Sequence, residues 1–356
     1  MKKSIWFMEG LSSQRDIISQ IIAHFGGEKA ERAIGIVASH RHDRADILAV
    51  ADHSYIEPKG CDDLLAFMQK IINKHRVIAI HASNRRHLLE QHRATIEAMG
   101  VKLITGATSL ASLQLADDKV AFAERMSLLD LPIVPSIRVT SAEHLKDLLA
   151  RKPFDEQIPC IKPVEGIYGQ GFWILDKEAK ASSCFANPDN RFVHPDVYLA
   201  AVEQHWPEDM VLMPYLPGAE YSVDMLMEKG RVLMAVGRCK DGSNQTLHIS
   251  GEAVELAKRC ASAMGADGLV NVQTKVDSQG KALLLEINTR PSGGIGYGLH
   301  SNIDLASAFA LHMMGLLDQA KIDRMMSCFQ PTELRIYSAT MPLEKNHSSC
   351  AVAGVM

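Results

Sequence analysis

The segment LLLEINTRPSGG, residues 283–294, ends an apolar run with side chains that can bind ions. Side chains on a strand alternate between its two faces, so we expect Glu286, Asn288 and Arg290 to share one face. The apolar residues between them should face the other way: Leu285 and Ile287. A buried strand that ends by presenting a carboxylate, an amide and a guanidinium together is typical of a site for a charged ligand.

The preceding segment GLVNVQTKV is predicted to pair with this strand as a hairpin that turns at residues 278–280. Asn271 and Gln273 alternate on it in the same way, which brings Gln273, Glu286 and Asn288 together as oxygen donors. Such oxygens are hard ligands that suit Mg²⁺ or Mn²⁺ with phosphate oxygens. One carboxylate with two amides binds a cation weakly, so the metal is expected to arrive with a nucleotide. The alternative is a polar strand end that only satisfies backbone groups.

A second candidate site is the glycine-rich loop EGIYGQGF, which follows Lys162. Backbone N–H groups of a glycine-rich turn can surround phosphate oxygens because no Cβ blocks their approach, and a nearby lysine adds positive charge. The P-loop pattern GxxxxGK[ST] is absent. The loop therefore indicates either phosphate binding or a simple hairpin turn. Its glycines are Gly166, Gly169 and Gly171.

The elements that must position these residues fall into two parts. In the first hundred residues, short apolar runs alternate with helical patterns, which predicts βαβ units and a parallel, doubly wound α/β sheet. The predicted strands are 4–8, 33–38, 77–82 and 101–105, and the predicted helices are 15–25, 62–74 and 85–99. The dinucleotide fingerprint GxGxxG is missing after the first strand, where EGLSSQ stands, so this part is expected to bind a substrate or to be structural.

The second part begins with one helix that carries Asp117, Asp118 and Lys119 and runs to about Leu129, where the segment LPIVPS ends it. The later predicted strands are 158–163, 209–216, 219–228 and 231–238, the last two joined by a Lys229-Gly230 turn. A helix is predicted over 249–266, before the hairpin of 268–288. This mixture of hairpins and helices indicates an α+β fold.

Composition limits the class of protein. The 356 residues suffice for two or three domains, and 47% hydrophobic with 22% charged residues is ordinary for a globular protein. The net charge of -4 gives no basic field that would favour nucleic acid or an anionic membrane. Seven dispersed cysteines without a CxxC pair fit a reducing compartment. The N-terminal apolar run is too short for a signal peptide and no segment is long enough to span a bilayer, so the sequence predicts a cytoplasmic protein.

The order of these features resembles the ATP-grasp superfamily. Lys119, then Lys162 with its glycine loop, the strand VLMPYLPGAEYSVD, Arg238 and the NVQ…EINTR hairpin follow one another within about residues 105–315. The hairpin is most similar to that of ATP-grasp domains of the carbamoyl phosphate synthetase type. The resemblance implies an N-terminal parallel, doubly wound pre-ATP-grasp domain followed by a two-lobed ATP-grasp fold. The implied boundaries are 1–107 for the first domain, 108–210 for the lobe with the glycine loop, 211–330 for the lobe with the metal site, and 331–356 for a terminal strand and a partly disordered tail.

The same resemblance implies how ATP is held. Lys119 and Lys162 would bind the α- and β-phosphates, and the three glycines would let the loop close over the β- and γ-phosphates: Gly166, Gly169 and Gly171. Glu220 would accept hydrogen bonds from the ribose. The adenine would be read through the backbone of the segment MPYL, which consists of Met213, Pro214, Tyr215 and Leu216. Many relatives carry Glu or Gln where Met213 stands, so one polar contact near the adenine is missing here.

It also implies the metal ligands and the catalytic residues. Gln273, Glu286 and Asn288 would bind one or two Mg²⁺ ions, with Mn²⁺ as an alternative metal. Arg238 and Arg290 would stabilise the transferring phosphoryl group and the acyl phosphate. Many relatives have a carboxylate where Gln273 stands, and its neutral amide lowers the charge of the site and leaves the second metal open.

The implied activity is that of an ATP-dependent ligase that forms carbon–nitrogen bonds. ATP would phosphorylate a carboxylate, and an amine or a related nucleophile would attack the acyl phosphate. The alternatives are carboxyphosphate or carbamoyl phosphate chemistry on bicarbonate, and a regulatory protein that binds ATP without turnover. The expected partners are a small carboxylate and an amine, with no nucleic acid and no membrane, and a homodimer is left open.

The acceptor is expected between the first domain and the metal hairpin, where the loops EGLSSQ and HASNRR end parallel strands. These loops offer side chains that could bind an acid: Ser12, Ser13, Ser83, Asn84 and Arg85. The alternative interpretation of Arg85, Arg86 and Arg93 is that they form the solvated face of a helix. Asp224 is interpreted either as a substrate contact or as part of a polar strand face.

Overall fold

The structure is a computed structural model that describes residues 2–26, 29, 32–166, 169–187 and 190–337. Two positions of the predicted glycine loop, 167 and 168, and the predicted tail beyond 337 lie outside the described residues. Within the described residues, no helix is both long enough and apolar enough to cross a membrane.

The N-terminal domain is a five-stranded parallel sheet with the order β3-β2-β1-β4-β5. Alternate residues of β1 enter two different cores, because Ile5 and Phe7 pack with α1 while Trp6 and Met8 pack with α3. This two-sided burial confirms the doubly wound sheet. The strands are β1 Ser4–Met8, β2 Gly35–His40, β3 His53–Ile56, β4 Val77–His81 and β5 Lys102–Ile104. The helices are α1 Ser13–Phe25, α2 Ala45–Leu48, α3 Cys61–His75, α4 Arg86–Gln91 and α5 Arg93–Glu97.

Two sequence predictions for this domain were incomplete. The edge strand β3 has the sequence HSYI and is mostly exposed, so it lacks the apolar run that predicts a buried strand. The helix predicted over 85–99 is two short helices, α4 and α5, which are separated at His92.

The helix predicted to carry Lys119 is also two helices, α6 Leu110–Asp117 and α7 Lys119–Leu128. Asp118 breaks it, because its backbone is extended and its carboxylate accepts hydrogen bonds from the N–H groups of Val120 and Ala121. This is an N-cap, which satisfies N–H groups that have no partner inside the helix. The single predicted helix was therefore wrong, and Lys119 is the first residue of a new helix.

The middle sheet has the order β6-β10-β7-β8-β9 and forms a separate lobe. Its strands are β6 Ile137–Val139, β7 Pro159–Pro163, β8 Trp173–Leu175, β9 Phe192–Val193 and β10 Met210–Pro214. Its helices are α8 Ala142–Arg151, α9 Ser183–Ala186 and α10 Pro195–Val202. Strand β10 pairs with both β6 and β7, so the boundary proposed between 210 and 211 falls inside a strand of this sheet.

The third sheet has six strands in the order β15-β14-β11-β12-β13-β16. Its strands are β11 Glu220–Glu228, β12 Arg231–Asp241, β13 Asn244–His248, β14 Gly268–Val276, β15 Ala282–Asn288 and β16 Glu333–Arg335. The turn between β11 and β12 lies at Lys229 and Gly230, both with positive φ, as the sequence predicted. One face of this sheet packs on α11 Glu252–Ala263.

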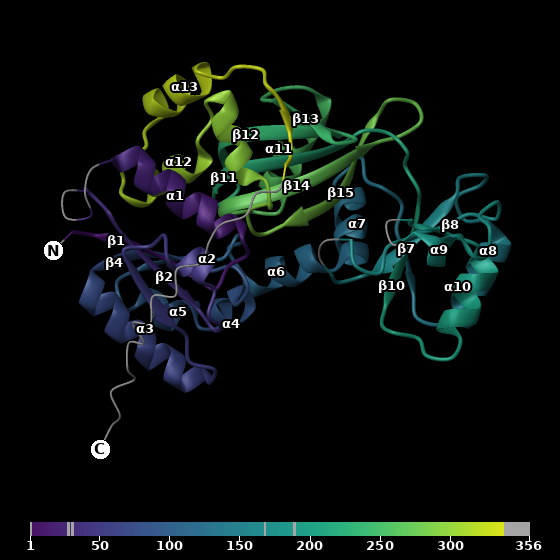
Figure 1. The fold of residues 1–356 in the computed structure, drawn as a ribbon, viewed down its shortest axis with the longest axis horizontal. Coiled ribbons are helices and arrows are strands. Elements are labelled where there is room, and N and C mark those ends of the chain that lie inside the picture. Colours follow the sequence, from purple (N-terminus) through teal and green to yellow (C-terminus); the bar gives the residue numbers. More distant parts are fainter. Residues whose placement is uncertain (1, 27–28, 30–31, 167–168, 188–189, 338–356) are drawn as a thin grey trace.

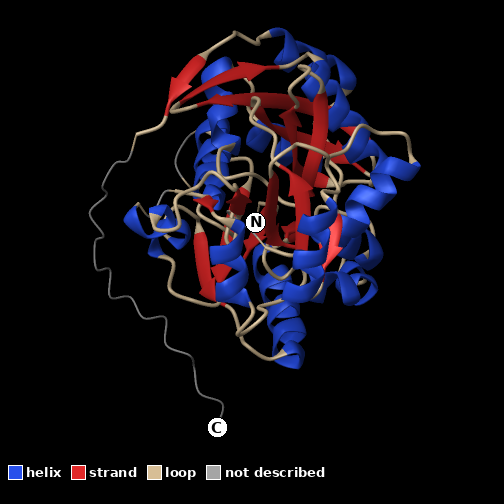
Figure 2. Ribbon diagram, turned by 90° about the vertical axis from the view of Figure 1, so that its right-hand side faces the viewer, coloured by secondary structure: helices blue, strands red, loops and turns tan. Residues whose placement is uncertain are grey.

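The other face of the six-stranded sheet joins the N-terminal domain through a shared core. Leu226, Met234 and Leu269 of this sheet belong to the same buried cluster as Phe7 of β1 and Phe309. The elements that complete the region are η1 Ile295–Ser301, α12 Leu305–Met313 and α13 Gln319–Ser327. Figure 1 shows these two regions stacked on one side, with the middle lobe on the other side beyond α6 and α7. Seen from the side of that lobe, the strands lie inside and most helices around them (Figure 2).

Candidate active site

A cavity of about 950 Å³ lies between the middle lobe and the six-stranded sheet. Its lining comes from β7, β8 and β10 on one side, and from β11, β12, β14 and β15 on the other. Of the residues predicted for the site, all except Gly171 line this cavity. Positions as distant as Lys119 and Arg290 are therefore brought together by the fold.

The floor of the cavity consists of three rows of side chains, which the register of β12, β11, β14 and β15 defines. The outer row is Lys240, Glu220 and Lys275. The middle row is Arg238, Ser222, Gln273 and Glu286. The inner row is Asp224, Asn271 and Asn288. Beyond the inner row, the same face of the sheet continues into the apolar core shared with the N-terminal domain. The outer row is therefore the one farthest from that domain.

A β-bulge sets the direction of Glu286. Gln273 pairs with Glu286 and Thr274 pairs with Leu284, which leaves Leu285 as an extra residue on β15. Leu285 therefore lies on the cavity side together with Glu286, and the prediction that it faces away was wrong. Ile287 faces the opposite core, as predicted. Bulges of this kind redirect side chains and are frequent beside active sites.

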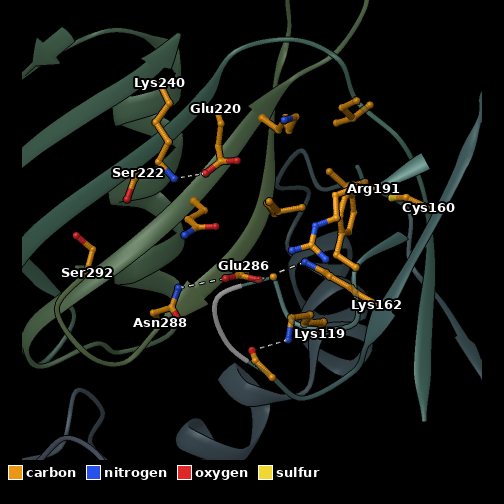
Figure 3. A pocket seen from close by; sticks show the side chains of 18 of the residues that line it. Lys119, Cys160, Lys162, Arg191, Glu220, Ser222, Lys240, Glu286, Asn288 and Ser292 are labelled. Carbon is orange, nitrogen blue, oxygen red and sulfur yellow. Dashed lines mark hydrogen bonds and ion pairs between the residues drawn. The ribbon is translucent and has the colours of Figure 1, made fainter. Parts of the chain in front are cut away.

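The two predicted lysines meet the predicted metal ligands in this cavity. Lys162 Nζ lies 3.3 Å from Glu286 Oε2, and the Nδ2 group of Asn288 donates to Glu286 Oε1 over 3.3 Å. Lys119 Nζ donates to the backbone carbonyls of Val164 and Gly166, over 2.9 and 3.3 Å. Figure 3 shows the Lys162 side chain directed at Glu286, with Lys119 below it. Positive charge from one lobe thus faces a carboxylate from the other.

Opposing influences set the charge of these groups. Burial alone raises the pKa of Glu286, but the charges of Lys162 and Lys119 and the hydrogen bonds from Lys162 and Asn288 lower it below its usual range. Burial lowers the pKa of Lys119, and the charge of Glu286 acts against that change. Glu286 is therefore an ionised carboxylate at neutral pH and a competent ligand for a cation.

Arg238 is held by a network of buried side chains. Its guanidinium donates to Gln245 Oε1 over 2.9 Å and to the hydroxyls of Ser222 and Ser292 over 2.9 and 2.8 Å. Asp224 of the inner row is fully buried and lies 3.5 Å from the same guanidinium. Arg238 lines the cavity, but protein acceptors occupy much of its donor capacity. Its role toward the phosphoryl group, like that of Arg290, stays a prediction.

The outer end of the cavity is the place predicted for the adenosine. Met213, Pro214, Tyr215 and Leu216 line it, and the N–H of Tyr215 donates to the carbonyl of Ile158 over 2.7 Å. Glu220, predicted to bind the ribose, forms an ion pair with Lys240 on the neighbouring strand. Gly166 and Gly169 line the cavity, whereas Gly171 lies on the far side of the loop against a second cavity of about 630 Å³.

The loops predicted to bind the acceptor are tied into the N-terminal domain. Arg85 Nη1 lies 3.3 Å from Glu57 Oε2, and both side chains are buried. The reading of Arg85 as part of a solvated face was therefore wrong, because a partner 28 positions away in sequence buries it. Ser13 and Ser83 are also buried. The acceptor position stays a prediction.

Sequence reasoning missed several polar residues of the cavity. They share the floor of the six-stranded sheet or the loop after β15: Ser222, Lys240, Gln245, Lys275 and Ser292. Asn271 was noted for its alternation with Gln273 but was not assigned a role. Cross-strand register is the information that identifies these residues, and a single strand sequence does not supply it.

The donor set fits a hard divalent cation. Among the described residues, no group of three or more His, Cys, Asp and Glu side chains could hold a metal. The candidate ligands are instead one carboxylate and amide oxygens, from Glu286, Gln273 and Asn288. The buried Oδ1 of Asn271 has no hydrogen-bond partner among the described residues. Such oxygens suit Mg²⁺, with phosphate oxygens and water completing the shell.

Comparisons with known proteins agree with this geometry. Residues 207–334 match a family described as ATP-grasp in the biosynthetic pathway with Ter operon. Over 263 residues, or 70% of this chain, the sequence is 22% identical to the carbamoyl phosphate synthase large chain of Clostridium botulinum (strain Alaska E43 / Type E3), and it spans only 22% of that protein's length.

Solved structures share the fold across nearly the whole chain. An ADP complex of N5-carboxyaminoimidazole ribonucleotide synthetase is similar with a TM-score of 0.63 and 15% identity, over 88% of this chain and 78% of the other. L-amino acid ligase from Bacillus licheniformis is similar with a TM-score of 0.61 and 12% identity, over 90% of this chain and 76% of the other. The chain is thus similar to ATP-grasp proteins in its family match over residues 207–334, and it shares the fold of these solved structures over most of its length.

Proposed function

We propose that this protein is an ATP-dependent ligase that activates a carboxylate as an acyl phosphate and transfers the acyl group to an amine. One observation carries the proposal: Lys119 of α7 and Lys162 of the middle lobe meet Glu286 and Asn288 of the six-stranded sheet within a single cavity of about 950 Å³. That volume accommodates a nucleotide and a small second substrate. Lysines, a carboxylate and amides are the groups that phosphoryl transfer requires, since it depends on position and charge more than on covalent catalysis.

Each part of the cavity has a distinct task in this reaction. The segment Met213–Leu216 binds the adenine, and Glu220 of the outer row binds the ribose. Lys119 and Lys162 bind the phosphates, and Gly166 and Gly169 supply backbone N–H groups beside them. Mg²⁺, when bound by Glu286, Asn288 and Gln273, neutralises phosphate charge.

The reaction takes place at the γ-phosphate, which is the terminal phosphate of ATP. A carboxylate oxygen of the acid attacks the γ-phosphorus of ATP, the bond to the β-phosphate oxygen breaks, and ADP leaves. Arg238 lies in the middle row and Arg290 lines the same cavity, and both would stabilise negative charge on the transferred group. An amine then attacks the acyl carbon, loses a proton and releases phosphate. We place the acid and the amine at the inner end of the cavity, toward the N-terminal domain.

A second candidate is the same phosphorylation with bicarbonate as the acid. The match to a carbamoyl phosphate synthase large chain and the fold shared with an N5-carboxyaminoimidazole ribonucleotide synthetase favour it. In this case the product of the first step is carboxyphosphate. The cavity residues have the same tasks in both reactions, so the acid alone distinguishes them.

The decisive experiment uses acids labelled with ¹⁸O. The purified protein is incubated with Mg²⁺-ATP, pools of ¹⁸O-carboxylates and amines, and ADP and phosphate are measured. An acyl phosphate transfers one labelled oxygen to the released phosphate, and hydroxylamine in place of the amine gives a hydroxamate. ADP release that needs only bicarbonate would support the second candidate. ATP binding without ADP release under every condition would overturn both and favour a regulatory protein.

A further inference from the structure

The inner row contains a buried amide whose oxygen has no partner in the described part of the chain. Asn271 is fully buried and lines the cavity. Its Nδ2 group donates to Ser222 Oγ over 3.0 Å and to Asp224 Oδ1 over 3.1 Å. Its Oδ1 atom accepts no hydrogen bond from any described residue. Buried polar atoms are nearly always paired, so this oxygen points to something that occupies the site during function.

The chemistry of Asp224 fixes which end of the amide faces the cavity. Both oxygens of Asp224 accept hydrogen bonds from Ser292 and the Arg238 guanidinium lies beside them, so the nitrogen of Asn271 lies toward Asp224 and its oxygen away from it. Asp224 is itself held in place, because the N–H and the hydroxyl of Ser292 donate to it over 3.1 and 2.8 Å. The direction of the Asn271 oxygen is therefore fixed by two strands, β11 and β14, and by the loop after β15.

The residue opposite Asn271 repeats this arrangement. Asn271 pairs with Asn288 in the register of β14 and β15, and directly opposed residues have their Cβ atoms about 5 Å apart. The Nδ2 group of Asn288 donates to the acceptor-only carboxylate of Glu286, which leaves the Asn288 oxygen as its free end. Two amide oxygens on neighbouring strands are thus both available to an electropositive ligand beside Glu286.

We propose that Asn271 Oδ1 is a further oxygen ligand of the divalent cation and extends the metal site from the middle row into the inner row. The inference rests on the proposed function, because it needs the cation that accompanies ATP. Amide oxygens are hard ligands of the kind that Mg²⁺ and Mn²⁺ accept. Asp224 and Ser292 are then positioning residues, which aim Asn271 without touching the metal.

The test exchanges the hard oxygen for a soft sulfur. Asn271→Cys should shift the metal preference toward Cd²⁺, because thiolates favour soft ions and Mg²⁺ favours oxygen. With the β,γ-methylene analogue of ATP, we expect a cadmium–thiolate absorption band. The ratio of analogue affinity in Cd²⁺ to that in Mg²⁺ should rise about tenfold over wild type.

Thr274→Cys is the matched control. Thr274 lies on the same strand and is fully buried with an unpaired oxygen, but its neighbours in the register face the opposite core. It adds the same number of thiols and should give neither the band nor the change in preference. Equal spectra and equal metal preference for the two variants would overturn the proposal.

Asn271→Asp provides a second readout if the cysteine variant does not fold. The new carboxylate would lie beside Asp224, so the variant should melt at a lower temperature than wild type without metal. As a metal ligand it should gain more from Mg²⁺ and the ATP analogue, by about 3 °C beyond the wild-type gain. A gain equal to that of wild type would assign Asn271 a structural role only. If wild type itself bound no Mg²⁺-nucleotide, the proposed function would fail first, which separates the two failures.

Discussion

Two clusters of polar side chains lie at strand ends in this protein, and they differ in how completely their polar groups are paired. In the N-terminal domain, Glu57 accepts hydrogen bonds from the N–H of Glu9 over 3.0 Å and from Ser39 Oγ over 2.7 Å. Arg85 pairs with its other oxygen, and Arg41 pairs with Glu9 over 2.8 Å. Every charge in this cluster meets a partner from the same domain, so the cluster is closed.

The cluster in the cavity is open. Lys162 comes from the middle lobe and Glu286 from the six-stranded sheet, and the Asn271 oxygen has no partner among the described residues. Burial of a polar group without a partner costs stability, whereas a closed set of hydrogen bonds offsets that cost. A charged strand end therefore points to a ligand when its pairing is incomplete and divided between lobes, whereas charge alone does not distinguish the two cases.

The largest expected effect comes from removing the carboxylate of the open cluster. Glu286→Gln is nearly isosteric, so the melting temperature should change little. Turnover should fall by at least about a hundredfold, which is the scale for removing one preorganised electrostatic group. Steady-state ADP release with the identified acid and amine is the measurement. Near-full activity in excess Mg²⁺ would show that Glu286 is not a metal ligand.

The corresponding change in the closed cluster should affect stability instead. Glu57→Gln removes the charge that Arg85 pairs with and should lower the free energy of unfolding by about 2 kcal/mol, the value of hydrogen bonds to a charged group. Urea denaturation measures this loss, and calorimetry should give an unchanged affinity for Mg²⁺-ATP. A selective loss of nucleotide affinity with normal stability would mean that this cluster belongs to the active site after all.

The pH dependence of the free energy of unfolding tests the apolar core of the N-terminal domain independently of both clusters. Burial lowers the pKa of His81 to about 4, and its ring packs against Phe7 and Phe309. The unfolded chain binds a proton below about pH 6.5 while the folded chain does not, so this contribution to stability is present at higher pH and is lost as the pH falls. Between pH 8 and pH 5 the loss should be about 2 kcal/mol.

The control for this profile is His81→Phe, because other histidines also titrate in the same range. The free energy of unfolding is measured by urea denaturation at several pH values for both proteins. The variant should lose about 2 kcal/mol less than wild type between pH 8 and pH 5. Parallel profiles would show that His81 is protonated in the folded protein or that its site admits water.

The smallest effect is expected at the outer row of the cavity. Glu220→Ala should weaken Mg²⁺-ATP binding by about 1 to 2 kcal/mol, the size of one lost charge-assisted hydrogen bond. Lys240→Met removes only its ion-pair partner and should leave the affinity almost unchanged. Equal losses for the two variants in calorimetry would mean that Glu220 acts through the ion pair and does not touch the ribose.

Much of the fold follows from local periodicity, and the exceptions have local or distant causes. The parallel sheet, the hairpins and the cluster of Gln273, Glu286 and Asn288 follow from apolar runs and period-two alternation. The break at Asp118 was missed although an aspartate before a helical turn is a known N-cap pattern. The burial of Arg85 was missed because its partner Glu57 is distant in sequence, and no periodicity within one helix encodes that contact.

The bulge at Leu285 determines which insertions and deletions in β15 the site can accept during evolution. A strand with regular alternation and the same apolar core would place its carboxylate one position earlier, at the residue after Leu284. Deleting Leu285 would restore regular alternation and keep Glu286 opposite Gln273, whereas inserting one more residue would restore the alternation but move Glu286 out of register with Gln273. Length variants of this strand are thus unequal: a one-residue contraction keeps the carboxylate beside Gln273, and a one-residue expansion moves the carboxylate along the strand away from Gln273. Homologous chains that differ here by one residue should be aligned by the face that each side chain occupies, with the gap placed at the bulge.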